Sequence, residues 1–270
     1  SIIQNYNIDC DVSGECNFIL AHHPKKFKQI REQAEIYKNE FGIETEIYSK
    51  EDFDKIGHTG TEQYGALSYK PGFAINPLKF VNGIARYALS KKLKIYDHSL
   101  VSKIEKNNNS YTLRTNEGSV NTKKIVVATN GFYQEGLVPQ MNSRILPVIS
   151  NIIVTRKLSK NEIDLHNFKT YSPIMNTKNL LYYYRKLPDN RILFGTRGDF
   201  IGSDQSNFNR SKKMEKFFKN IFPDWSKISI DYSWRGFIAM SQKLTPSIGK
   251  IENEEIYYGF GYHGVGVSTA

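Results

Sequence analysis

The stretch EIYYGFGYHGVGVSTA, residues 255–270, joins an apolar strand to a Gly-rich turn. The strand ends at Tyr258, the turn runs from Gly259 to Gly266, and small residues that suit a helix start follow. Glycines let a backbone approach a ligand closely, and a helix N-terminus offers free N–H groups and a positive dipole end. The stretch therefore predicts a seat for an anionic or polarised group, such as a phosphate or the pyrimidine edge of a flavin. A plain strand-turn-helix corner is the alternative.

The composition is that of a folded protein with room for one large domain or two modest ones. Hydrophobic residues make up 39% and aromatic residues 13% of the 270 residues, so a sizeable core can form. The net charge of +10 is compatible with anionic partners. The lysines are nevertheless spread along the chain, so we do not expect a nucleic-acid partner.

Cysteine usage and hydropathy predict a cytoplasmic protein without a metal site. The two cysteines, Cys10 and Cys16, have no metal-ligand spacing and no histidine cluster beside them. No apolar run reaches the roughly 18 residues of a membrane-spanning helix, so no membrane span is expected. The first residues lack the charged and apolar regions of a signal peptide.

Two amphipathic helices are expected in the first third of the chain. Residues 24–41 carry apolar side chains at helical spacing, and Gly42 suits the C-terminal cap. Asn76 is expected to cap the second helix, which runs from Pro77 to about Ser90. Its inward face is predicted to carry four apolar residues, namely Leu78, Val81, Ala85 and Ala88.

The remainder reads mainly as β-structure around one further helix. A meander over 100–123 leads into the run 125–128, which is apolar on both faces and is therefore expected to be a central buried strand. Two strands around the turn 188–190 predict a hairpin. A helix over 207–222 and a long strand over 228–240 follow.

Nine short motifs together resemble one protein family. They are, in order, YNIDC (6–10), GFAINPL (72–78), VSKI (101–104), VVATNG (126–131), YYR (183–185), DNRILFG (189–195), WRG (234–236), PSIG (246–249) and GFGYHGV (259–265). Each motif is weak alone. In this order they resemble the D-amino acid oxidase-type FAD-dependent oxidoreductases, and the chain is most similar to the gamma-glutamylputrescine oxidoreductases among them.

The resemblance implies an α+β fold with two interleaved parts. An incomplete α/β layer of the FAD/NAD(P)-binding type would be built from residues 73–140 and 234–270. An antiparallel-sheet substrate domain would be built from residues 1–72 and 141–233.

The family's dinucleotide fingerprint, G-x-G-x-x-G after its first strand, lies N-terminal to all of these motifs in the family. The chain therefore resembles the interior of a family member cut at both ends, and alone it is expected to bind FAD poorly. The family motif GGHG reads Gly261-Tyr262-His263-Gly264 here, so a tyrosine adds bulk beside the flavin seat.

The family reaction is hydride transfer from a C–H bond beside an amine to flavin N5, followed by hydrolysis of the imine. The resemblance places the adenosine side of FAD against Val101 and residues 128–131, and the N1–C2=O edge of the flavin against the turn 259–266. His263 is a candidate for proton handling or for donation to the flavin. A His that only caps a backbone carbonyl is the alternative. Attachment of FAD is expected to be non-covalent, because neither cysteine is near the C-terminus. The cofactor-binding candidates are Val101, Ala128, Thr129, Asn130, Gly131, Gly259, Gly261, Tyr262, His263, Gly264, Val265 and Gly266.

The substrate is expected to be a small amine or amino acid. Tyr182 and Tyr184 share one strand face, where an aromatic surface can hold an amine, and Arg185 on the other face can clamp a carboxylate. Trp234 and Arg235 form a second candidate pair. The alternatives are an ordinary aromatic cross-strand surface and a solvated arginine.

Two other functions remain open at this point. One is the oxidase part of a tRNA wobble-uridine modifying enzyme, which shares the family and would suit the positive charge. The other is an inactive fragment that needs a partner chain carrying the fingerprint. The sequence favours FAD-dependent oxidation of an amine or amino acid of the gamma-glutamylputrescine type.

Overall fold

The computed structural model describes residues 1–199 and 203–269, and these form two compact units. The first unit comprises residues 1–93, 151–198 and 203–235. The second unit comprises residues 94–150, 199 and 236–269. Three strands belong in part to each unit, namely β8 (Leu146–Thr155), β11 (Ile192–Asp199) and β12 (Ile230–Met240).

An eight-stranded sheet in the order β12-β8-β11-β10-β9-β1-β3-β2 organises the first unit. Its pairings are antiparallel except between β1 and β9, in the strand pairs whose register is known. The predicted hairpin is confirmed as β10 paired antiparallel with β11. The other strands of the sheet are β1 (Asn17–Leu20), β2 (Glu44–Tyr48), β3 (Ala66–Lys70), β9 (Ile174–Asn176), β10 (Tyr182–Lys186) and β11 (Ile192–Asp199).

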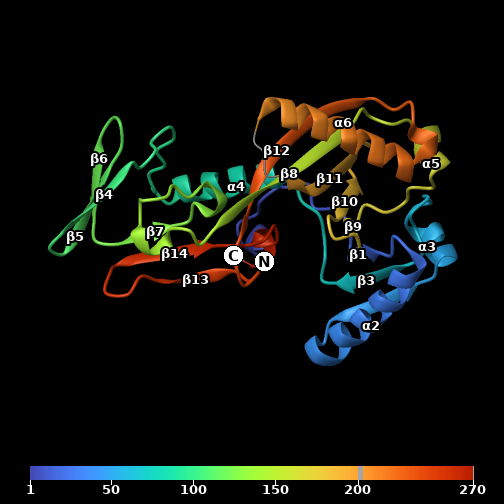
Figure 1. Cartoon of the computed structure of the whole chain (residues 1–270), viewed down its shortest axis with the longest axis horizontal. Coiled ribbons are helices and arrows are strands. Elements are labelled where there is room, and N and C mark those ends of the chain that lie inside the picture. Colours follow the sequence, from blue (N-terminus) through green and yellow to red (C-terminus); the bar gives the residue numbers. More distant parts are fainter. Residues whose placement is uncertain (200–202, 270) are drawn as a thin grey trace. The chain divides into compact units, whose positions relative to one another are not determined.

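Two long helices pack against this sheet (Figure 1). Helix α2 (Pro24–Phe41) follows the predicted bounds and ends at Gly42, which adopts the left-handed conformation expected of a C-terminal cap. Its buried residues pack with those of β1 and β3. Helix α6 (Asp204–Ile221) packs on the aromatic residues of β10 and β11. The shorter helices of this unit are α1 (Ile2–Asn5), α3 (Lys50–Ile56), α5 (Lys160–Leu165) and η3 (Pro223–Trp225).

Helix α4 (Pro77–Ser90) begins as predicted, because the Asn76 side chain accepts a hydrogen bond from the Lys79 N–H. Its predicted inward face is wrong in part. Leu78 is 69% and Val81 59% exposed, whereas Gly83 is the buried residue of the helix. A Cβ on Gly83 would lie 2.3 Å from a side-chain carbon of Ile8, so the helix approaches its neighbour through the glycine.

The second unit contains two three-stranded sheets (Figure 1). The predicted meander is an antiparallel sheet of β4 (Lys103–Asn107), β5 (Ser110–Arg114) and β6 (Ser119–Thr122). The other sheet has the order β13-β14-β7, with bounds Ser247–Lys250, Ile256–Phe260 and Ile125–Val127. The remaining elements are η1 (Asn130–Phe132), η2 (Pro139–Met141) and α7 (Gly266–Thr269).

The prediction that residues 125–128 form a central buried strand is wrong. Within the described residues, β7 is an edge strand that pairs only with β14, and Val126 is 71% exposed. Ile125 and Val127 do pack in the core of the second unit with the residues of β14. The strand is therefore covered on one face only.

The expected α+β class is confirmed, and the compact units divide the chain differently from the expected domains. Residues 73–93, which include α4, belong to the first unit. The assignment of FAD binding and substrate binding to separate parts of the chain stays a prediction. None of the helices in the described part of the chain is both long and apolar enough to cross a membrane.

Candidate functional site

Parallel pairing brings together two of the predicted cofactor segments in the second unit. Strand β14 pairs parallel with β7, with Tyr258 opposite Val127. Because parallel strands end at the same edge of a sheet, residues 128–131 and 259–266 both begin at that edge. The Gly261 N–H donates a 3.1 Å hydrogen bond to Asn130 Oδ1, which joins the two segments directly. This edge corresponds to the place where open α/β sheets bind ligands.

Several glycines of the closing turn have conformations or contacts that require glycine. Gly261 and Gly264 have φ of 74° and 84°, in the left-handed region. A Cβ on Gly266 would lie 3.0 Å from the Tyr262 Cβ, so the tyrosine that replaces a family glycine packs against the start of α7. The turn is therefore held in a compact conformation that leaves little space for side chains.

His263 is 9% exposed and is fixed by three neighbours within the second unit. Its backbone N–H donates to the Ala239 carbonyl. In the ring, Nε2 lies 3.1 Å from Ser241 Oγ and Nδ1 lies 3.2 Å from Met240 Sδ. Both ring nitrogens thus have a neighbour inside the protein. In the described part of the chain the ring contacts a hydroxyl and a thioether and caps no backbone carbonyl, and a role of His263 in proton handling stays a prediction.

The other predicted cofactor residues lie in two places. Ala128 and Thr129 are exposed directly after β7, and Gly131 lies in η1 close to the Phe237 side chain. Val101 is half-buried and precedes β4 in the other sheet of the unit. Among the described residues, no hydrogen bond or ring contact connects Val101 to the edge formed by β7 and β14.

The first unit has a cavity of about 700 Å³ on the face of the sheet opposite α6. Most of its lining is aliphatic or aromatic, which is typical of small-molecule sites. It also contains Arg185 and Trp234, two residues predicted to contact substrate. The lining residues are Ala74, Ile75, Asn76, Pro77, Leu78, Ile152, Pro173, Ile174, Tyr183, Tyr184, Arg185, Leu187, Leu193 and Trp234.

Arg185 is the charged group of this cavity. Its Nη2 donates a 2.7 Å hydrogen bond to the Ile75 carbonyl, and in the described part of the chain the guanidinium forms no ion pair. Burial lowers the pKa of Arg185, an effect that the Asp11 carboxylate opposes. A half-buried guanidinium without a paired carboxylate is well placed to bind an anionic group bidentately.

Tyr183 lines the cavity beside Arg185, although it is not among the predicted substrate residues. The two residues are two positions apart on β10 and share a face, as the strand period requires. The Tyr183 ring lies over Gly195, its cross-strand partner, where an added Cβ would be 2.2 Å from the ring Cζ. The signal was available in the sequence, because period 2 places residue 183 with residue 185.

The rings of Tyr182 and Tyr184 lie in the aromatic core beneath α6. They are 7% and 2% exposed, and the Tyr184 hydroxyl lies 2.9 Å from His58 Nε2. Tyr184 also contributes to the cavity wall, whereas Tyr182 does not line the cavity. The predicted aromatic surface for an amine is therefore mainly a packing surface in this structure.

The predicted pair Trp234 and Arg235 is divided between the two sides of β12. Trp234 lines the cavity and is 46% exposed. Arg235 is absent from the cavity lining, and its Nη1 donates a 3.0 Å hydrogen bond to the Ser203 carbonyl. The alternation of side chains along a strand explains why adjacent residues separate.

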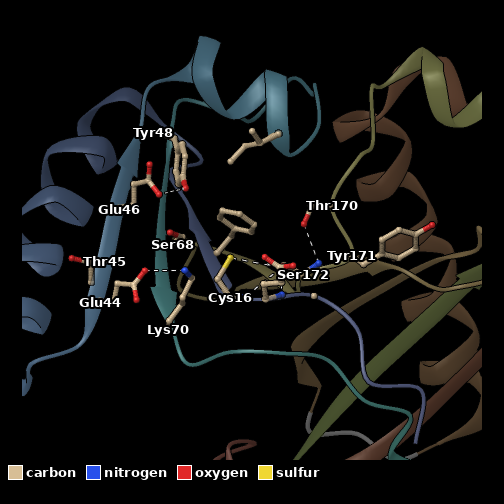
Figure 2. A pocket seen from close by; sticks show the side chains of 14 residues that line it. Cys16, Glu44, Thr45, Glu46, Tyr48, Ser68, Lys70, Thr170, Tyr171 and Ser172 are labelled. Atoms are coloured by element: carbon tan, nitrogen blue, oxygen red, sulfur yellow. Dashed lines mark hydrogen bonds and ion pairs between the residues drawn. The ribbon is translucent and has the colours of Figure 1, made fainter.

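A second cavity of about 410 Å³ lies over β2 and β3 and is polar (Figure 2). Two of its carboxylates are engaged, because Lys70 Nζ lies 2.8 Å from Glu44 Oε1 and the Tyr48 hydroxyl donates to Glu46 Oε2. Burial raises the pKa of the Cys16 thiol, which disfavours the reactive thiolate. The cavity that contains Arg185 is therefore the better candidate for substrate binding.

Across the described residues, no cluster of three or more His, Cys, Asp or Glu side chains could hold a metal ion.

Comparison with curated protein sequences identifies relatives over nearly the whole chain. The chain is 28% identical over 273 residues to the probable oxidoreductase OrdL of Haemophilus influenzae, covering 98% of this chain and 60% of that protein. It is also 28% identical over 267 residues to the gamma-glutamylputrescine oxidoreductase of Escherichia coli, covering 98% of this chain and 61% of the relative. The chain thus spans about 60% of the length of these relatives.

Solved structures with the same fold cover the chain equally well. L-proline dehydrogenase from P. horikoshii superposes with a TM-score of 0.80 at 19% identity, over 98% of this chain and 70% of that one. Glycine oxidase from Geobacillus kaustophilus superposes with a TM-score of 0.80 at 15% identity, over 98% and 70% of the two chains. The family model described as FAD dependent oxidoreductase (DAO) matches residues 1–270. The chain therefore belongs to the FAD-dependent oxidoreductase family, as its ordered motifs predict.

Proposed function

We propose that the protein oxidises a small amine or amino acid with FAD as cofactor, and that Arg185 binds a carboxylate of the substrate. Family membership supports the cofactor and the reaction type. The observation that carries the substrate part is the guanidinium of Arg185, which lies in a largely apolar cavity without an ion-pair partner among the described residues. A desolvated cation of this kind gains strongly from an anionic ligand.

The residues at the edge formed by β7 and β14 fit one side of a flavin. The turn after β14 has glycines at left-handed positions, and Asn130 fixes it to the segment after β7. Compact Gly-rich turns at the ends of parallel strands allow a planar ring system to approach the backbone. When bound, FAD would supply the electron-accepting ring for hydride transfer. Non-covalent attachment is part of the proposal, because both cysteines, Cys10 and Cys16, are buried.

The chain's own residues would bind and orient the substrate. Arg185 would hold the carboxylate, with its orientation set by the hydrogen bond to Ile75. The rings of Tyr183 and Trp234 would form walls that exclude water from the apolar part of the substrate. The finer proposal leaves two substrate types, namely gamma-glutamylputrescine, which 28% identity to that oxidoreductase supports, and an amino acid without a second ammonium group. A cytoplasmic location belongs to the same proposal.

Anaerobic reduction of the bound flavin tests the function. The protein would be purified as its gene encodes it, and its cofactor released and identified by chromatography. A panel of amines and amino acids, with gamma-glutamylputrescine among them, would then be mixed with the oxidised protein without oxygen. We expect at least one carboxylate-bearing amine to bleach the flavin absorbance. The proposal fails if no amine or amino acid reduces a flavin that dithionite still reduces.

A further inference from the structure

The charge distribution in the cavity of the first unit points to a narrower class of ligand. We infer, on the basis of the function proposed above, that this cavity selects a carboxylate with an uncharged apolar body. It discriminates against a ligand that carries a positive charge along that body. Of the two substrate types proposed above, this cavity therefore favours an amino acid with an apolar side chain over gamma-glutamylputrescine, whose putrescine end carries an ammonium group.

The lining contains one charged residue, and that residue is a cation. Arg185 lines the cavity, whereas none of the described lining residues is an aspartate or a glutamate. An ammonium group inside the cavity would lose its hydration and would meet a charge of its own sign. A carboxylate would lose its hydration too, but Arg185 would replace it with charge-assisted hydrogen bonds.

The polar groups near Arg185 are already engaged within the protein. Asn76 accepts a hydrogen bond from the Lys79 N–H through Oδ1 and donates to Asp11 Oδ2 through Nδ2. The Ile75 carbonyl accepts from Arg185 at 2.7 Å. An incoming ammonium would therefore have to share an acceptor that already serves an internal donor.

Asp11 is the anion that influences Arg185, and it is neutralised outside the cavity. Its Oδ1 lies 2.5 Å from Lys79 Nζ, and this contact lowers the pKa of the Asp11 carboxyl. Asp11 does not belong to the cavity lining. It therefore offers no counter-ion to a cationic ligand within the cavity.

The aromatic walls do not reverse this preference. Trp234 and Tyr183 line the cavity, whereas the ring of Tyr184 lies in the core beneath α6, and aromatic faces attract cations. That attraction is weaker than the contact of a desolvated ammonium with a carboxylate, and here it is opposed by the guanidinium. The polar cavity over β2 and β3 shows the contrast, because Glu15, Glu44 and Glu46 line it against Lys70.

The tryptophans provide a direct reporter of binding that does not depend on FAD. The chain has two, of which Trp225 is fully buried in the core and Trp234 lines the cavity. Fluorescence titrations would compare caproate, ε-aminocaproate, hexylamine and hexanol, which share one chain length and differ in charge. Trp234→Phe would show whether the signal comes from the cavity, and calorimetry would give the affinities of that variant.

We expect caproate to bind most tightly and ε-aminocaproate about tenfold more weakly, a difference typical of one unpaired buried polar group. Hexylamine should bind no better than hexanol. Arg185→Met should reduce caproate affinity to the level of hexanol, and Arg185→Lys should retain part of it. Thermal unfolding and circular dichroism of both variants would establish that they are folded.

Equal affinity for caproate and ε-aminocaproate would overturn the inference, and so would unchanged caproate binding in a folded Arg185→Met protein. The result is separable from that of the flavin experiment. If the ligands bind in the expected order but no amine reduces the flavin, the proposed function is wrong and the selectivity of the cavity stands. If an amine reduces the flavin but the ligands do not bind in that order, only the selectivity is wrong.

Discussion

The Tyr184 hydroxyl and the Nε2 of His58 lie 2.9 Å apart in the core of the first unit, although 126 residues separate them in the sequence. His58 is fully buried, and its ring stacks on Phe168 with centroids 4.9 Å apart. Its Nδ1 lies 3.1 Å from the Thr59 carbonyl. Both ring nitrogens are therefore satisfied while the imidazole is neutral, as a buried histidine requires.

The stability of the protein should fall when the pH is lowered from 6.5 to 4. Burial lowers the pKa of His58 from 6.5 to about 4. In the unfolded chain His58 takes up a proton below its ordinary pKa, whereas the folded protein excludes that proton until the lower value. The unfolded state thus binds more protons in this interval, and the free energy of unfolding should fall by roughly 2 kcal/mol across it.

Urea unfolding at a series of pH values checks this prediction. His58→Gln removes the titrating group and retains hydrogen-bonding capacity, so its unfolding free energy should depend less on pH. Part of the dependence should persist, because burial also lowers the pKa of His166. An identical pH dependence in the wild type and in His58→Gln would contradict the assignment to His58.

Glu162 should contribute stability that is fully present above pH 4.5 and lost as the pH falls towards 2. Its hydrogen bonds with Arg156 and with the Ser159 N–H lower the pKa of the carboxyl from 4.5 to about 2. The folded carboxyl thus stays ionised while the unfolded one takes up a proton. Because the pair is partly exposed, Glu162→Gln should cost about 1 kcal/mol at neutral pH.

The matched control for this change is Glu117→Gln in an exposed turn. That variant should stay within about 0.5 kcal/mol of the wild type. Chemical unfolding at neutral and acidic pH would compare the two variants. If Glu162→Gln loses as much stability on acidification as the wild type, the carboxyl is not the titrating group.

Gly195→Ala should displace the Tyr183 ring and weaken ligand binding in the cavity. An added Cβ would lie 2.2 Å from the ring Cζ and 2.5 Å from the hydroxyl oxygen. Because the ring end of a side chain can move, the cost in stability should be modest, about 1 kcal/mol. The affinity for caproate, measured through Trp234 fluorescence, should fall by more than partial unfolding of the variant would account for.

Two further variants test whether the clash with the Tyr183 ring causes the loss of affinity. Gly118→Ala is the control, because nothing lies within 4 Å of an added Cβ at that position. In a protein that already carries Tyr183→Ala, Gly195→Ala should cost no further affinity or stability, because the ring that clashes with the added Cβ is gone. Additive effects of the two substitutions would show that Gly195 is needed for another reason.

Asn130→Gly should make the turn 259–266 of the second unit more mobile. The substitution removes the acceptor of the Gly261 N–H, while glycine readily adopts the left-handed φ of 46° found at this position. Loss of one hydrogen bond should cost about 1 kcal/mol. Amide hydrogen exchange at Gly261 should become several-fold faster, whereas Asn130→Asp, which retains an acceptor, should keep most of the protection. Unchanged exchange in Asn130→Gly would exclude the proposed anchoring.

The local structure of this protein was largely predictable because it depends on neighbours in the sequence. Pro24 and Gly42 bound α2, and Asn76 with Pro77 begins α4, as their backbone preferences require. Period 2 along β10 correctly separated residues 182 and 184 from residue 185. The pattern could not tell which face meets the core, because aromatic residues suit both a core and a binding surface.

The sequence alone was enough to predict the family, most of the helices and strands, and the candidate site residues. The tertiary structure decided which of those residues meet. It joined Gly261 to Asn130 through the parallel pairing of β7 and β14, a contact across 131 residues. It also placed Arg185 against Ile75 in an apolar cavity and left Arg235 outside it. Local propensities act over a few residues, whereas strand pairing and burial depend on segments far apart in the chain, which is why only the fold could settle these contacts.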